Sequence, residues 1–189
     1  MKSRLLLSLL VIAFLTGCSG GQVATVSYDS GSNRSVYETK RYEVSSLSGS
    51  GYGSTGAMRM RVVAQCTGVS CTPNVAQLVF GIDGSERLSL SDVSGRIIAD
   101  ETVVRWSSTE ANRGFAGTRE GEVVEVLGEF ATVEIDVDQL QAMATATSLE
   151  GSLGGQSLNL DADVQFGLQT LLQKMRQSRS DGNSSNTGA

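Results

Sequence analysis

The sequence contains no histidine at all, and this absence narrows the chemistry open to the chain. Histidine is the usual general base near neutral pH and the commonest metal ligand, so the chain lacks the side chain on which many hydrolases and zinc sites depend. Aromatic residues make up only 5%, with a single tryptophan, Trp106. A sugar-stacking platform would have to combine Trp106 with Tyr37, Tyr42 and Tyr52, and one tryptophan is more typical of a core anchor.

Positive charge is also scarce. The 189 residues carry 15 Lys and Arg against 20 Asp and Glu, which gives a formal net charge of −5. Contact with nucleic-acid phosphates needs clustered Lys and Arg, so we do not expect nucleic acid as a partner. The length is sufficient for one ordinary domain with a hydrophobic core of its own.

Long hydrophobic runs are missing except for one. Leu5 to Leu15 is apolar apart from Ser8, and it follows the positively charged Lys2 and Arg4. As a helix, these eleven residues would span about 16 Å, roughly half of a bilayer's hydrocarbon core. Charged residues, a short apolar run and then small residues are the order of a secretory signal. The run therefore predicts a leader rather than a membrane span.

Leu15-Thr16-Gly17-Cys18 resembles the lipobox of bacterial lipoproteins, with Leu15 three positions before the cysteine and the small Gly17 directly before it. The resemblance implies that residues 1–17 are a signal peptide, removed by cleavage. It also implies that Cys18 receives a diacylglyceryl group on its thiol and a further acyl chain on its freed amine. Two or three acyl chains would make membrane attachment effectively permanent. Covalent lipid on Cys18 is the only attached group that we expect, with no cofactor and no metal.

The residue after the cysteine, Ser19, resembles the outer-membrane sorting pattern of enteric bacteria, which implies a place on the outer membrane facing the periplasm. Residues 18–35 are rich in Gly and Ser and predict a flexible tether. Residues 177–189 lack large apolar side chains and predict a disordered tail. Between them we expect one β-rich domain, residues 36–176.

The first half of this domain has the period of β-strands. Between Met58 and Cys66 every second side chain is apolar, and Val63 is the one large apolar residue on the other face. Ala76 to Ile82 alternates in the same way. Further short strands are expected at residues 87–90, 97–99, 102–107, 122–127 and 131–135. Several short strands at this spacing favour a mainly β fold, an antiparallel β-sandwich or a strongly curled sheet.

Two short helices are expected near the C-terminus, on either side of a hairpin. Asp136 and Gln139 have the spacing of a capping box at the start of the first helix. Gly154-Gly155 predicts the hairpin turn. The second helix is expected to begin at Asp161, and its apolar face has helical spacing: Val164, Leu168, Leu171, Leu172 and Met175. Asn159, Asp161 and Asp163 could begin a calcium loop, but the required glycine is missing, so a helix cap is favoured.

Cys66 and Cys71 are separated by four residues in the loop between two expected strands. In an oxidising periplasm we expect them to form a structural disulfide. A redox pair is less favoured because the C-x-x-C spacing is missing, and a zinc site because four ligands are needed and histidine supplies none. Cys18 is then left over as the lipid-bearing residue.

Two other patterns suggest chemistry. Gly51 to Gly56 matches the G-x-G-x-x-G of dinucleotide-binding loops, but a strand is expected after it where that fold needs a helix. We therefore expect a plain loop. Three acidic side chains could supply an acid and a base for glycoside cleavage: Glu120, Glu122 and Glu125. Their spacing is equally typical of a solvated strand face.

The expected function follows from the anchor and from the lack of a readable catalytic constellation. The domain is similar to predicted envelope lipoproteins of unassigned function, a resemblance that implies no site residues. We expect a non-catalytic protein-interaction or assembly module, attached to the membrane by its lipid and bound to an envelope protein. The alternatives are a module that binds polysaccharide or lipid and, less favoured, a carboxylate-dependent hydrolase.

Overall fold

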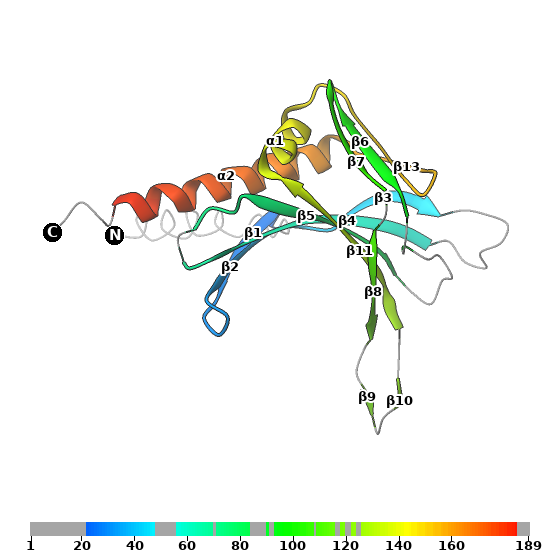
Figure 1. Ribbon diagram of the computed structural model, residues 1–189, viewed down its shortest axis with the longest axis horizontal. Helices are drawn as coiled ribbons and strands as arrows, with labels where there is room; N and C mark the ends of the chain where they lie inside the picture. Colours follow the sequence, from blue (N-terminus) through cyan, green and yellow to red (C-terminus); the bar gives the residue numbers. More distant parts are fainter. Residues whose placement is uncertain are drawn as a thin grey trace, which may run out of the picture.

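The computed structural model describes residues 22–47, 56–69, 71–83, 90, 93–107, 109–115, 118–119, 122–123 and 126–184. Cys18, Tyr52 and the glycine motif up to residue 55 lie outside these residues. The fold is mainly β, with antiparallel pairing between all described neighbouring strands and with two helices (Figure 1). The predicted fold class is confirmed, and both larger sheets are open over the described residues.

A seven-stranded sheet, the large sheet, has the strand order β1-β2-β4-β5-β11-β8, with β3 paired to β4 beside β2. Its strands are β1 (Ala24–Asp29), β2 (Arg34–Thr39), β3 (Tyr42–Leu47), β4 (Gly56–Thr67), β5 (Val75–Asp83), β8 (Glu110–Phe115) and β11 (Val126–Asp136). Two very short strands, β9 (Thr118–Arg119) and β10 (Glu122–Val123), pair with each other and extend the β8–β11 hairpin away from the domain (Figure 1).

The alternation predicted for β4 and β5 is confirmed. The residues of both strands that were expected on one face are buried, apart from the half-buried Cys66, and they meet in cross-strand register, as Met60 does with Phe80. The neighbouring edge of β4 is shared, because β2 pairs with its second half and β3 with its first half. At the junction, Val62 N donates a hydrogen bond to Thr39 Oγ1 at 3.0 Å. The threonine hydroxyl thus satisfies a buried amide where the strands change over.

A four-stranded sheet, the small sheet, has the order β13-β12-β6-β7. It comprises β6 (Gly95–Ala99), β7 (Thr102–Trp106), β12 (Leu149–Leu153) and β13 (Gln156–Leu158). Gly154 and Gly155 have positive φ values of 58° and 81° and form the predicted turn between β12 and β13. Trp106 joins the two sheets, because its ring stacks on Phe80 of β5 at a centroid distance of 6.0 Å. Its predicted role as a core anchor is confirmed.

Helix α1 (Val137–Thr145) begins with the predicted capping box: Gln139 N donates to Asp136 Oδ1 at 2.6 Å, and Asp136 N donates to Gln139 Oε1 at 3.1 Å. Helix α2 (Ala162–Ser184) is capped by Asp161, whose Oδ1 accepts hydrogen bonds from Asp163 N and Val164 N. The five apolar residues predicted for its inner face are all buried. Neither described helix is long and apolar enough to cross a bilayer.

Three expected boundaries need correction. Strand β1 and the start of β2 lie inside residues 18–35, where a flexible tether was expected. Apolar and polar residues alternate from Ala24 to Tyr28, which is typical of a strand, but the high Gly and Ser content of the whole segment favoured a tether. Helix α2 has 23 residues and is not short, and it continues beyond Arg176 to Ser184. Its last turns follow Met175, the last residue whose side chain is described as buried, and residues 177–184 contain no large apolar side chain whose periodicity could mark them.

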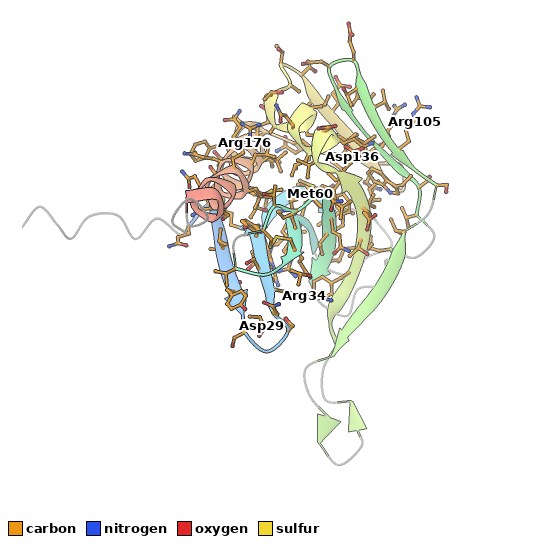
Figure 2. All side chains as sticks on the ribbon, turned by 60° about the vertical axis from the view of Figure 1, so that its left-hand side comes forward. Asp29, Arg34, Met60, Arg105, Asp136 and Arg176 are labelled. Carbon is orange, nitrogen blue, oxygen red and sulfur yellow. A yellow bond between two sulfur atoms is a disulfide. The ribbon has the colours of Figure 1, made fainter. Side chains whose placement is uncertain are left out.

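Both helices and the small sheet cover the same face of the large sheet (Figures 1 and 2). Helix α2 contacts β1 and β2, and α1 contacts β5 and β11. Asn159, after β13, donates from its backbone N to Val44 O of β3 at 2.6 Å. The buried side chains form one continuous core between these layers. The domain is thus a sandwich whose second layer is part sheet and part helix.

Candidate binding surfaces

The disulfide belongs to the structural framework. Cys66 and Cys71 are bonded, with a Cα–Cα separation of 5.8 Å, as predicted. Their loop is tied to β2, because Tyr37 Oη donates to Cys71 O at 3.0 Å and Ser35 Oγ donates to Gly68 O at 2.6 Å. Both β2 side chains are buried, so the bridge closes one end of the core and its loop has little freedom.

The structure does not assemble the sugar platform. Tyr37 is fully buried and Tyr42 is 6% exposed, so neither ring presents a face to a ligand, and Tyr52 lies outside the described residues. Among the candidate acids, Glu120 and Glu125 also lie outside them, and for Glu122 only the backbone, in β10, is described. Within the described part of the chain, no group of three or more Cys, Asp or Glu side chains is arranged to hold a metal ion.

Strand β1 is an edge of the large sheet. Lys40 N donates to Val23 O at 2.9 Å, so these two residues form a hydrogen-bonded pair of the antiparallel β1–β2 ladder. Hydrogen-bonded and non-hydrogen-bonded pairs alternate along such a ladder. The backbone groups of Thr25 and Ser27 therefore point to β2, and those of Val26 and Tyr28 point outward. The Val26 and Tyr28 side chains are 42% and 43% exposed. Natural edges are usually protected by Lys, Pro or a bulge, and β1 contains none of these.

The turn after β1 is fixed by Asp29. Its Oδ2 accepts a hydrogen bond from Ser32 Oγ at 2.6 Å, and its Oδ1 accepts one from Gly31 N at 2.9 Å. These bonds, that from Ser32 first, lower the pKa of the Asp29 carboxyl from its usual value. Tyr28 Oη also donates to Asn33 Oδ1 across the turn at 2.8 Å. The exposed edge is therefore held in one extended shape, which reduces the entropy lost when a partner binds.

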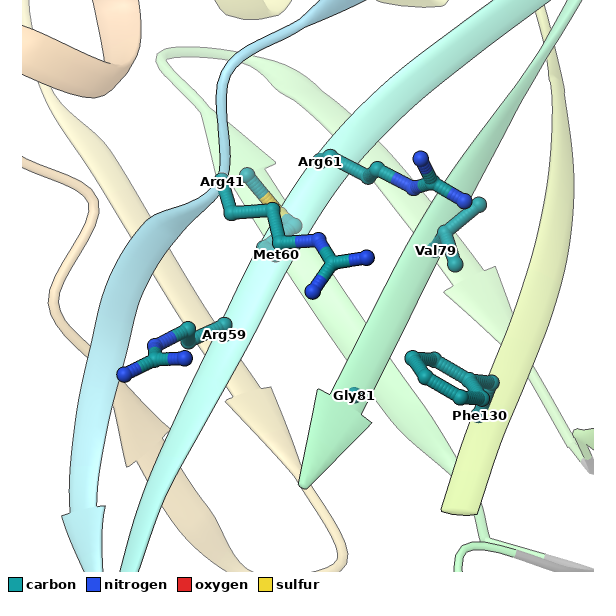
Figure 3. Close-up of a pocket in the computed structure, with 7 residues that line it drawn as sticks. All are labelled: Arg41, Arg59, Met60, Arg61, Val79, Gly81 and Phe130. Atoms are coloured by element: carbon teal, nitrogen blue, oxygen red, sulfur yellow. The ribbon is translucent and has the colours of Figure 1, made fainter. Parts of the chain in front are cut away.

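A second surface lies on the uncovered face of the large sheet (Figure 3). Arg41 precedes β3, while Arg59 and Arg61 project from β4 beside Phe130 of β11, over Gly81 of β5. The hollow between them is about 10 Å³, which is room for one water molecule.

Arg61 of this cluster is ion-paired. Arg61 Nη1 lies 3.1 Å from Glu38 Oε2, with both side chains about one third exposed. The cluster has the arginine and aromatic content of interface hot spots, but its hollow is too small for an organic ligand.

At the far end of the small sheet, Asp100 links two loops. It has a positive φ of 51°, and its carboxylate accepts hydrogen bonds from Thr147 N and Ser148 N at 2.8–3.1 Å. These backbone bonds, that from Thr147 first, lower the pKa of Asp100. The turn between β6 and β7 is thereby fixed to the segment that leads from α1 into β12.

Comparisons of the chain with models of known protein families, with curated proteins and with solved structures gave no match. The functional proposal therefore rests on the residues. The most informative of them, Val26 and Tyr28, lie in the segment whose Gly and Ser content predicts a tether. The signal that could have found them is the alternation of Ala24, Val26 and Tyr28 before a turn rich in Asp, Gly and Asn.

Proposed function

We propose that this chain is a lipid-anchored protein of the cell envelope whose β domain binds an extended segment of another envelope protein, without catalysis. The anchor part of the proposal is supported by the lipobox-like sequence that ends at Cys18. The binding part is carried by one observation, the unprotected edge of β1. A partner segment would add to this edge as a further strand.

Strand addition suits this edge for two reasons. The outward backbone groups at Val26 and Tyr28 supply donors and acceptors in the spacing that an antiparallel or parallel strand requires. Their exposed side chains supply apolar area on one face of the added strand, where alternate residues of the partner would pack. Main-chain hydrogen bonds would then give affinity, and the two side chains would select the partner.

The edge also lies close to the proposed anchor. Only five residues, 19–23, separate Cys18 from Ala24, the first residue of β1. Even fully extended, this connection reaches only about 20 Å. The partner segment is therefore expected near the membrane surface, which favours another membrane-attached protein.

Site-specific photocrosslinking in cells tests the proposal. The full chain would carry p-benzoylphenylalanine at Val26 or at Tyr28, and the matched control would carry it at Phe166, which is 57% exposed on α2. We expect one discrete crosslinked envelope protein from each β1 position and none from Phe166. Equal yields at all three positions, or no product from β1, would contradict strand addition.

Charge on the edge gives a second test. Replacing Val26 and Tyr28 together by lysine adds the protection that natural edges carry. Both side chains are more than 40% exposed, and the change also removes the hydrogen bond from Tyr28 to Asn33. We expect this variant to keep its melting temperature within a few degrees and to lose the crosslink from a probe at Ser27. Retention of the crosslink with a folded variant would refute the β1 edge as the contact surface.

A further inference from the structure

The uncovered face of the small sheet carries a row of hydrogen-bond donors that crosses all four strands. Ser157 of β13 pairs with Ser152 of β12, Ser152 pairs with Arg96 of β6, and Arg96 pairs with Arg105 of β7. Their chain neighbours on the other face are buried in the core: Ile97, Val104, Leu153 and Leu158. The four side chains of the row therefore share the outer face, and Figure 2 shows Arg105 projecting away from the domain.

Two like charges face each other in this row. Arg96 and Arg105 are direct cross-strand partners, with Cβ atoms about 5 Å apart, an arrangement that destabilises a sheet. Neither guanidinium has an ion pair or hydrogen bond with a described residue, in contrast to Arg61 with its partner Glu38. The nearest described acid on this face, Glu150, is opposite Ile98 and only diagonal to Arg96. A bound anion would relieve the repulsion between the two arginines.

Two shallow, open hollows lie beside the row. One hollow of about 300 Å³ is lined on one side of the row by Ser94, Gly95, Arg96, Arg105 and Trp106, among others. A second, of about 150 Å³, is lined by Arg96, Ile98, Glu150 and Ser157, among others. The row measures about 14 Å across four strands, and it ends at the two edge strands, β13 and β7. A rod-like polymer could therefore lie along the row over all four strands of the small sheet.

We propose that this face binds an acidic polysaccharide, with the carboxylate groups of the polymer placed between Arg96 and Arg105. Guanidinium groups bind carboxylates through paired, charge-assisted hydrogen bonds. The hydroxyls of Ser152 and Ser157 continue the row as uncharged donors and acceptors for sugar hydroxyls. In the next cross-strand row, Ile98 and Val103 supply apolar surface for the C–H faces of sugar rings. The surface thus combines charged and hydroxyl contacts in one row with apolar contacts in the next.

A membrane surface is the less suitable occupant. Recognition of anionic lipid needs about four to eight Lys and Arg side chains together, and this row provides two. This site does not include the β1 edge, so the proposal for either surface could be refuted without affecting the other.

Intrinsic fluorescence gives a direct measurement, because Trp106 is the only tryptophan and lines the larger hollow. The full-length lipidated protein in neutral detergent would be titrated with oligogalacturonate, and in parallel with its methyl ester, which has the same sugars without charge. We expect a saturable fluorescence change with the acid, weakened by salt, and none with the ester. Absence of saturable binding at low salt, or equal binding of the ester, would overturn the proposal.

Variants then test the residues. Replacing Arg96 and Arg105 together by Gln should weaken oligogalacturonate binding about tenfold or more. The matched control replaces Arg34 and Arg176, which lie elsewhere on the domain, by Gln (Figure 2). This control should bind oligogalacturonate as the unchanged protein does. Equal weakening in both variants would show a general charge effect and refute the site. A second result would also refute the proposal: oligogalacturonate binds neither the unchanged protein nor the Arg96/Arg105 variant, while phosphatidylglycerol vesicles bind the unchanged protein and not the variant.

Discussion

The contact between Tyr42 of β3 and Gly167 of α2 allows a quantitative test of how the second layer is attached. Tyr42 Oη is buried and has no hydrogen-bond partner among the described residues. A Cβ atom on Gly167 would overlap this oxygen and would lie 2.6 Å from the ring atom Cζ. Gly167→Ala therefore forces the tyrosine ring and the helix apart.

Two effects of opposite sign compete in Gly167→Ala. Alanine is favoured over glycine inside a helix by about 1 kcal/mol. Forcing an extra methyl group into a packed core costs about 1–3 kcal/mol, and Tyr42 is a buried ring that cannot swing away into solvent. The difference is a net loss of about 0–2 kcal/mol in the free energy of unfolding, and the overlap with a buried ring places our expectation toward its upper end.

Tyr42→Phe separates the two effects. It removes a buried hydroxyl that has no partner, so it should be neutral or should stabilise the protein by about 1 kcal/mol. In the double variant the nearest overlap is gone, and we expect the cost of Gly167→Ala to shrink to about 0–1 kcal/mol. Urea unfolding followed by Trp106 fluorescence measures all four proteins. If Gly167→Ala stabilised the protein equally with Tyr or Phe at position 42, the contact and the reasoning would be refuted.

The same tyrosine predicts a response to alkaline pH. Burial, followed by the charges of Asp163 and Asp161, raises the pKa of Tyr42 to about 12 from an ordinary value of 10.0. Between these values the unfolded chain releases the phenol proton and the folded protein keeps it. Stability should therefore fall as the pH rises from 10 to 12. Tyr42→Phe should remove this part of the loss, and melting curves over that range would measure it.

Four further outcomes are expected. Cys18→Ala should abolish fatty-acid labelling and release the chain from membranes, and persistent labelling would exclude the lipobox. Thiol titration of the denatured, unreduced protein should find no reactive cysteine, and loss of the Cys66–Cys71 bridge should cost about 2 kcal/mol; two free thiols would exclude the bridge. Asp136→Ala should cost about 1 kcal/mol in urea unfolding through loss of the α1 cap, whereas an unchanged midpoint would argue against the cap. The lowered pKa of Asp100 predicts stability that is present above its unfolded pKa and lost as the pH falls through its folded pKa; Asp100→Asn should flatten that acid limb of the melting curve.

Local patterns in the sequence were sufficient to predict the elements that are determined by residues close together in the chain. The alternation of β4 and β5, the Asp136 cap and the turn at Gly154 and Gly155 all depend on residues within a few positions of each other. The buried face of α2 was predictable for the same reason, since its apolar residues recur at helical spacing.

The candidate surfaces were less predictable because they depend on distant segments. Arg96 and Arg105 become partners only through the β6–β7 register, which sequence alone fixes within a few residues at best. Arg41 and Phe130 are brought together by strand order, which no local pattern encodes. The β1 edge was readable in principle, but its side chains face solvent and leave a weak apolar signal.

The arginines above the uncovered face of the large sheet have a consequence for solubility. Val63 and Val79 lie on that face, which neither helix nor small sheet covers, yet each is only 8% exposed. Arg41, Arg59 and Arg61 surround Val79, and such side chains bury their methylene stems while keeping the charge in water. They therefore act as a thin third layer, supplied by single side chains. Shortening all three to alanine would leave an apolar strip on this face of the sheet, and we expect that variant to self-associate more than the unchanged protein.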